Sequence, residues 1–187
     1  MVCRFTYSAG VFCSLGLDLF LIPDETSIST SFKPPNSTIT FQALDKSTWT
    51  PSFPDAHEQS SPGAALDNNA GSNNLAFISN KIPLSWFQVT FPERVIGISR
   101  VEAVKRRSLN ERFQQVELRI GDADETGKGL EQLSANPLVG YFGEMVNNPL
   151  ATFEVAPPAD GKYLTLQKLT TGGNGGLEFY EIFVLVV

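Results

Sequence analysis

Four basic side chains lie close together in VEAVKRRSLNERFQQVELRIGD, residues 101–122 of an otherwise acidic chain: Lys105, Arg106, Arg107 and Arg112. They fall on a short turn between two apparent strands. Guanidinium groups present several donors in a fixed fork, so such a turn can hold a polar or anionic ligand. The same turn can equally be a solvated hairpin tip that its charges keep soluble. The sequence leaves both interpretations open.

The chain lacks the patterns expected of a catalytic centre. It carries no Gly-x-Ser-x-Gly motif, no Ser-His-Asp order with supporting context, and no cluster of His and Cys for a metal. Its single histidine, His57, falls in a loop flanked by proline. The acidic stretch GDADETGKG, residues 121–129, lacks the ligand spacing of an EF-hand, so we interpret it as a polar turn. The sequence predicts a binding module and not an enzyme.

Short runs of β-favouring residues surround the candidate binding residues and indicate the strands that would position them. In LSWFQVTF, residues 84–91, the apolar Phe87, Val89 and Phe91 alternate with Trp86 and Gln88, so the two sets face opposite sides of a strand. Further strands are indicated by ISRVEAV, FQQVELRIG, ATFEV, KYLTLQKL and LEFYEIFVLVV. GLEQLSANPL is the best short-helix candidate. Short strands separated by turn residues predict an all-β protein, a β-sandwich or barrel.

Length and composition limit the number of domains and the kind of partner. The 187 residues fit one domain with an extension. Residues 1–23 form an apolar segment, interpreted as a signal peptide or a truncated upstream region, and we expect the domain over residues 24–187. Both cysteines, Cys3 and Cys13, precede that domain. The net charge of −6 argues against nucleic acid as a partner.

Five segments, in this order, resemble one family: AALDNN, WFQVTF, RFQQVELRIG, GKYLTLQKL and LEFYEIFV. Together they span about residues 45–187. The order resembles the discoidin-like, galactose-binding-like jelly rolls, which include the C-type domains of coagulation factors and the F-type lectins, or fucolectins. The resemblance implies an all-β jelly-roll β-sandwich, of which this chain is a divergent member. It is much less specific for the ligand.

The resemblance also implies a structural calcium ion that ties a loop to the last strand. Calcium prefers carboxylate and carbonyl oxygens. The matching positions are two carboxylates, Asp67 and Glu181, and three backbone carbonyls, those of Ala64, Asn69 and Tyr180. Asn68 replaces a glycine of the family motif, and Asn tolerates positive φ, so the turn can survive. Alternatively, the aspartate caps a turn and the glutamate is a surface strand residue.

In the fucose-binding members, a histidine, an arginine and a second basic residue about seven positions further on hold the sugar. Arg112 matches the second basic residue, and Arg106 or Arg107 the first, in a turn that is shorter by one or two residues. The histidine is missing, because Phe77 or its neighbours occupy that region. Fucose specificity therefore does not carry over, while another saccharide or polar ligand remains open.

These observations predict a lectin-like, carbohydrate-binding module that is extracellular or secreted and has a glycan or glycoprotein as partner. Weak single sugar sites depend on multivalency, so a homo-oligomer is possible. The alternatives are an adhesion or protein-interaction module that has lost sugar binding, and an accessory domain of a larger enzyme or receptor. Binding to membrane phospholipid would need exposed apolar loop residues. Leu84 and Leu109 are the candidates, but we interpret them as buried or incidental turn residues and do not expect membrane phospholipid as a partner.

Overall fold

The computed structural model describes residues 41–68, 76–80, 82–105, 112–143, 148–169 and 176–187. Within these ranges the chain forms antiparallel strands and one short 3-10 helix, η1 (Pro62–Leu66). The strands are β1 (Gln42–Ala43), β2 (Thr50–Ser52), β3 (Phe77–Ile78), β4 (Trp86–Lys105), β5 (Val116–Gly121), β6 (Leu138–Phe142), β7 (Leu150–Lys168) and β8 (Glu178–Val186). The all-β prediction is confirmed. The predicted domain boundary at residue 24 lies outside the described residues, among which no helix is long and apolar enough to cross a membrane.

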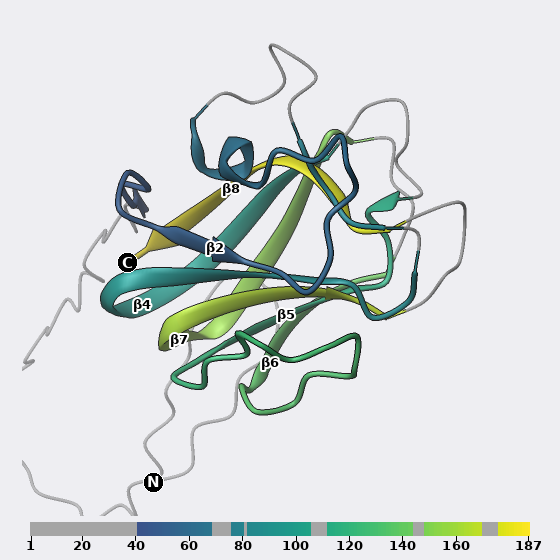
Figure 1. The fold of residues 1–187 in the computed structure, drawn as a ribbon. Helices are drawn as coiled ribbons and strands as arrows, with labels where there is room; N and C mark the ends of the chain where they lie inside the picture. Colours follow the sequence, from purple (N-terminus) through teal and green to yellow (C-terminus); the bar gives the residue numbers. More distant parts are fainter. Residues whose placement is uncertain (1–40, 69–75, 81, 106–111, 144–147, 170–175) are drawn as a thin grey trace, which may run out of the picture. The chain divides into compact units, whose positions relative to one another are not determined.

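Two long strands, β4 and β7, bend and contribute to both layers of a sandwich (Figure 1). The first half of β4 pairs with the second half of β7, with Phe87 opposite Leu166, in a layer that also holds β2, β5 and β6. The second half of β4 pairs with the first half of β7, with Val101 opposite Phe153, and with β8. β8 in turn pairs with β1 and β3. Gly97, with φ of 72°, lies in the bend of β4, where the register shifts.

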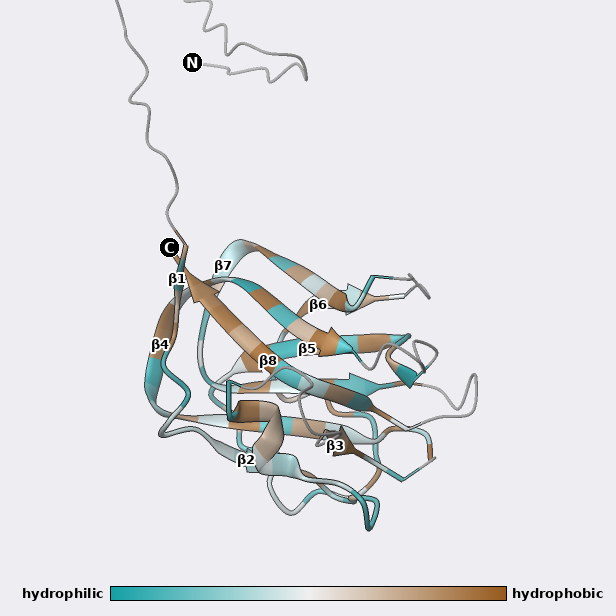
Figure 2. Cartoon of the chain, turned by 90° about the horizontal axis from the view of Figure 1, so that it is seen from above, coloured by the Kyte–Doolittle hydropathy of each residue, from teal (hydrophilic) through white to brown (hydrophobic). Residues whose placement is uncertain are grey.

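The core between the layers confirms the predicted alternation in β4. Phe87, Val89 and Phe91 are fully buried there, and the ring of Phe87 lies 4.6 Å from that of Phe77. Figure 2 shows the apolar segments along β4, β5 and β8 that enclose this core. Trp86 faces the other side of β4 and is 1% exposed. Neither ring of the Trp-Phe pair is therefore available to stack on a sugar, and both are packing residues.

The short helix predicted for GLEQLSANPL is wrong, because residues 129–137 form an irregular loop and Leu138 begins β6. Side chains of the sheet bind its backbone directly. Trp86 Nε1 donates to the carbonyl of Gly129 at 3.0 Å, and Gln167 Nε2 donates to that of Glu131 at 2.7 Å. The amide of Leu133 donates to Gln167 Oε1 at 2.9 Å. Tertiary hydrogen bonds thus override a weak local preference for helix.

Candidate functional site

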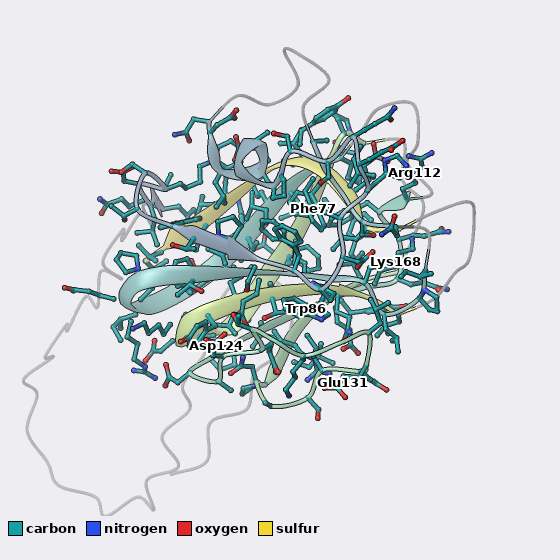
Figure 3. The ribbon with its side chains drawn as sticks, in the orientation of Figure 1. Phe77, Trp86, Arg112, Asp124, Glu131 and Lys168 are labelled. Atoms are coloured by element: carbon teal, nitrogen blue, oxygen red, sulfur yellow. The ribbon has the colours of Figure 1, made fainter. Side chains whose placement is uncertain are left out.

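The strand ends near the predicted basic turn meet at one end of the sandwich. β4 ends at Lys105, Arg112 precedes β5, β7 ends at Lys168 and β8 begins at Glu178. We call these four residues the rim cluster. Arg112 and Lys168 lie at the end of the sandwich opposite the bends of β4 and β7 (Figure 3). The strand order thus collects three cationic side chains and one carboxylate around the connections between strands.

The rim cluster is held together by hydrogen bonds and an ion pair. The guanidinium of Arg112 pairs with the carboxylate of Glu178, whose side chain is 1% exposed, whereas that of Arg112 is 18% exposed. The fully buried Lys168 directs its ammonium at two backbone carbonyls, those of Arg112 at 3.2 Å and Gln114 at 3.3 Å. Nε of Arg112 is buried and donates no hydrogen bond within the described part of the chain. The guanidinium is therefore oriented by its ion pair and partly accessible, and its Nε–H has no acceptor among the described residues.

Lys105 is a rim residue for which the sequence alone predicts no separate role. It stands seven positions before Arg112, the spacing that the resemblance requires between two basic residues. Its side chain is fully buried, with Nζ 5.1 Å from the centre of the Phe142 ring, and burial lowers its pKa. Arg106 and Arg107 lie outside the described residues, so their part in the rim stays a prediction. Counting seven residues back from Arg112 would have identified the lysine.

The structure places Glu181, a predicted calcium ligand, in a buried ion pair. Its side chain is fully buried on the face of β8 opposite Ile182, and its carboxylate pairs with the ammonium of Lys46, which is 2% exposed. The same ammonium donates to the carbonyl of Ile182 at 3.1 Å and lies 4.3 Å from the centre of the Phe183 ring. The amide of Ile182 donates to Glu181 Oε1 at 3.2 Å. Lys46 was not predicted, and no local pattern marks it.

The remaining calcium positions are only partly brought together. Ala64 is buried in η1, Asp67 is exposed just after it, and Tyr180 is partly buried on β8. Asn69 lies outside the described residues. Asn68 has φ of 64°, which confirms that Asn supports the positive φ predicted for this turn. Among the residues that the structure describes, no group of three or more His, Cys, Asp or Glu side chains is arranged to hold a metal.

A calcium ion does not fit well at the buried carboxylate. The ammonium of Lys46 already pairs with Glu181, and it would repel a divalent cation placed beside the same oxygens. Calcium also needs six to eight oxygen ligands, typically from several carboxylates and carbonyls. The calcium site thus stays a prediction, and the ion pair counts against it.

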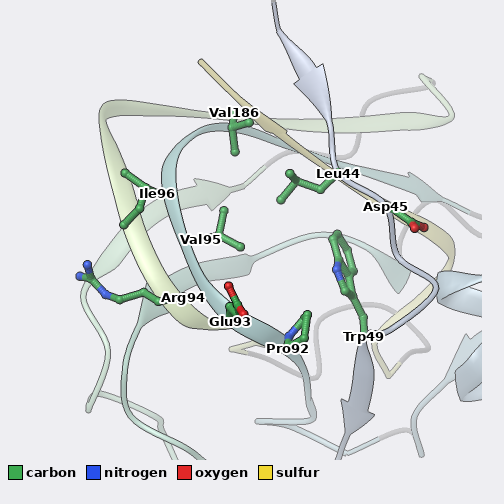
Figure 4. Close-up of a pocket in the computed structure, with 9 residues that line it drawn as sticks. All are labelled: Leu44, Asp45, Trp49, Pro92, Glu93, Arg94, Val95, Ile96 and Val186. Atoms are coloured by element: carbon green, nitrogen blue, oxygen red, sulfur yellow. The ribbon is translucent and has the colours of Figure 1, made fainter.

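A pocket of about 430 Å³ lies at the other end of the sandwich, beside the bend of β4 (Figure 4). It is lined by a mixture of apolar and charged residues: Leu44, Asp45, Trp49, Pro92, Glu93, Arg94, Val95, Ile96 and Val186. Arg94 is engaged elsewhere, in ion pairs with Asp122 at 3.1 Å and Asp160 at 3.6 Å. The ring of Trp49 packs edge-on against Phe91 at 5.0 Å. The pocket is separate from the rim cluster.

Comparison with known proteins identifies the fold. No protein-family model matches the sequence, and a search of curated proteins finds no match. Among solved structures, a fucolectin from the serum of striped bass (Morone saxatilis) superposes with a TM-score of 0.63 at 18% identity, over 78% of this chain and 49% of that one. A family 32 carbohydrate-binding module from Clostridium perfringens, in complex with galactose, gives 0.59 at 20% identity, over 78% and 99% of the two chains. The lectin domain of lectinolysin, in complex with Lewis b antigen, gives 0.60 at 15% identity, over 76% and 95%.

These similarities confirm the fold predicted from the sequence. The chain has the galactose-binding-like jelly-roll fold, and its structural neighbours include F-type lectins and family 32 carbohydrate-binding modules. It spans about half the length of the striped bass lectin and nearly the whole of the bacterial modules. At identities of 20% and below, the likeness concerns the fold, and ligand binding has to be argued from the residues of this chain.

Proposed function

We propose that this domain binds carbohydrate at the end of the sandwich that carries the rim cluster. The observation that carries the proposal is the orientation and partial exposure of the Arg112 guanidinium. Its guanidinium is oriented by the buried carboxylate of Glu178, remains 18% exposed at the side chain, and keeps one N–H without an acceptor among the described residues. Sugar hydroxyl and ring oxygens accept hydrogen bonds from such a donor fork.

The environment of Arg112 favours a preformed site. Lys168 holds the backbone of Arg112 through its carbonyl, so both main chain and side chain of the arginine are restrained before a ligand arrives. A preorganised donor loses little conformational entropy on binding, which raises affinity for a small polar ligand. The solved neighbours include proteins in complex with galactose and with Lewis b antigen, and this supports a glycan as the ligand class.

The proposal is tested by glycan-array binding and titration calorimetry on the wild type and two arginine variants. Arg112→Lys keeps the charge but loses the fork, so we expect at least a tenfold loss of affinity for the glycans that the wild type binds. Arg94→Lys is the matched control, because Arg94 is an ion-paired arginine at the opposite end of the domain. Its affinity should equal that of the wild type. Melting temperatures of all three proteins verify that each is folded.

A blank array for the folded wild type, or wild-type affinity in Arg112→Lys, would refute sugar binding at the rim. The first result would favour the second candidate, a protein-interaction module. One observation supports that alternative: the edge strand β6 exposes Leu138 at 50% and Tyr141 at 56%. Exposed apolar side chains beside unpaired backbone groups of an edge strand are typical of protein-binding surfaces.

A further inference from the structure

The segment that carries Lys46 is hydrogen bonded to the last strand just before the lysine and closes a turn just after it. The amide of Leu44 donates to the carbonyl of Val184 on β8 at 3.0 Å. After the lysine, the amide of Trp49 donates back to the carbonyl of Lys46 at 3.0 Å, closing a turn. This geometry directs the side chain of Lys46 along the outer face of β8 to Glu181.

The surroundings of the ammonium supply what a buried cation needs. It has a carboxylate partner in Glu181, a carbonyl acceptor in Ile182 at 3.1 Å and the face of the Phe183 ring at 4.3 Å. Buried charges are tolerated only when they are paired and hydrogen bonded, and both side chains of this ion pair are 1% exposed or less. The pair joins residues far apart in the sequence, and so connects the segment before β2 to the last strand.

We propose that the ammonium of Lys46 takes the place, at the Glu181 carboxylate, of the calcium ion that the family resemblance implies. The cation that ties a loop to β8 is then part of the chain itself, and the folded domain does not depend on calcium. A fixed ammonium satisfies one carboxylate, whereas a calcium ion would require further oxygen ligands to converge on the same position. This inference concerns the scaffold and holds whichever ligand binds the rim.

Thermal melts with calcium chloride and with EDTA test the inference on the intact chain. A ligand that binds only the folded state raises the melting temperature by mass action, so the wild type should melt within about 1 °C in the two buffers. Lys46→Met removes the ammonium but keeps the apolar stem, so the buried carboxylate of Glu181 loses this ion pair. Its melting temperature should fall on the order of 10 °C. The same substitution at the exposed Lys162 is the control and should shift the melt by no more than about 1 °C.

A double variant keeps the test decisive if Lys46→Met folds poorly. The double variant Lys46→Met/Glu181→Met replaces the ion pair by apolar groups and should recover most of the lost melting temperature. A clear rise of the wild-type melt with calcium, or a Lys46→Met melt equal to that of the wild type, would overturn the inference. Glycan binding is measured separately in EDTA, so loss of the proposed function and failure of this inference give different results.

Discussion

Replacing Gln167 by methionine tests whether the loop over Trp86 is held by one side chain of β7. Gln167 is fully buried and makes three hydrogen bonds to backbone groups, with the carbonyls of Leu84 at 3.1 Å and Glu131 at 2.7 Å and the amide of Leu133 at 2.9 Å. Methionine has a similar length but none of these polar atoms. Since each buried group left without a partner costs ~1–3 kcal/mol, we expect a loss of roughly 3 kcal/mol in unfolding free energy.

Urea denaturation and thermal melts measure this loss. For a domain of this size a change of 1 kcal/mol moves the melting temperature by ~2–4 °C, so Gln167→Met should melt roughly 6–12 °C below the wild type. Hydrogen exchange adds a local readout: the amide of Leu133 should lose more protection than the core amides, which change only with global stability. Gln59→Met, at an exposed position, is the control. A stable Gln167→Met with a protected Leu133 amide would show that other contacts hold the loop.

Two further predictions concern packing and acid stability. A Cβ on Gly161 would lie 2.6 Å from the backbone nitrogen of Gly121, so Gly161→Ala should lower the unfolding free energy by ~1–3 kcal/mol in urea denaturation. Gly63→Ala is the control and should be near neutral, because a Cβ there would meet nothing within 4 Å. Equal losses in the two variants would contradict the close approach of Gly161 to Gly121. The pKa of Asp124 is lowered below 3.8, chiefly by hydrogen bonds from the side chain and backbone of Thr126, while burial acts in the opposite direction. A lowered carboxyl pKa stabilises the fold above 3.8 and this gain is lost as pH falls through the folded pKa. The melting temperature of Asp124→Asn should therefore fall less steeply than that of the wild type as the pH drops below about 4. The same pH dependence in both proteins would refute a stabilising role for the ionised Asp124.

The alternation of side chains in β4 made the core of this strand predictable, because residues two apart share one face of a strand. The local pattern also predicts that LSWFQVTF and ISRVEAV are separate strands. The structure joins them in one strand, β4, that passes through Pro92 and Gly97 and changes layer. Such a bend depends on pairing with β7, which no local pattern reveals. The wrong helix prediction has a similar cause, since Gln167 lies on a distant strand and holds the loop in an irregular conformation.

The candidate site was predictable to the extent that it depends on positions along the chain. Arg112 and the positive φ of Asn68 follow from residue type and spacing. The partners of Arg112 could not be predicted in the same way, because they come from other strands. Glu178 and Lys168 reach the rim only through the order of β7, β4 and β8. Lys46 approaches β8 from a segment at the other end of the chain. Pairings of this kind are properties of the topology and leave no trace in local sequence.

The passage of β4 and β7 through both layers has a consequence for how the domain acquires its structure. Neither layer has a complete set of strands of its own, so neither can fold first and wait for the other. The pairing of Gln42 with Val186 joins the two ends of the described chain, and closing so long a loop costs more entropy than forming a local contact. Folding of such a topology is expected to be slow and all-or-none, with most contacts formed late between distant segments. A nascent chain therefore remains without a stable core until β8 has been synthesised.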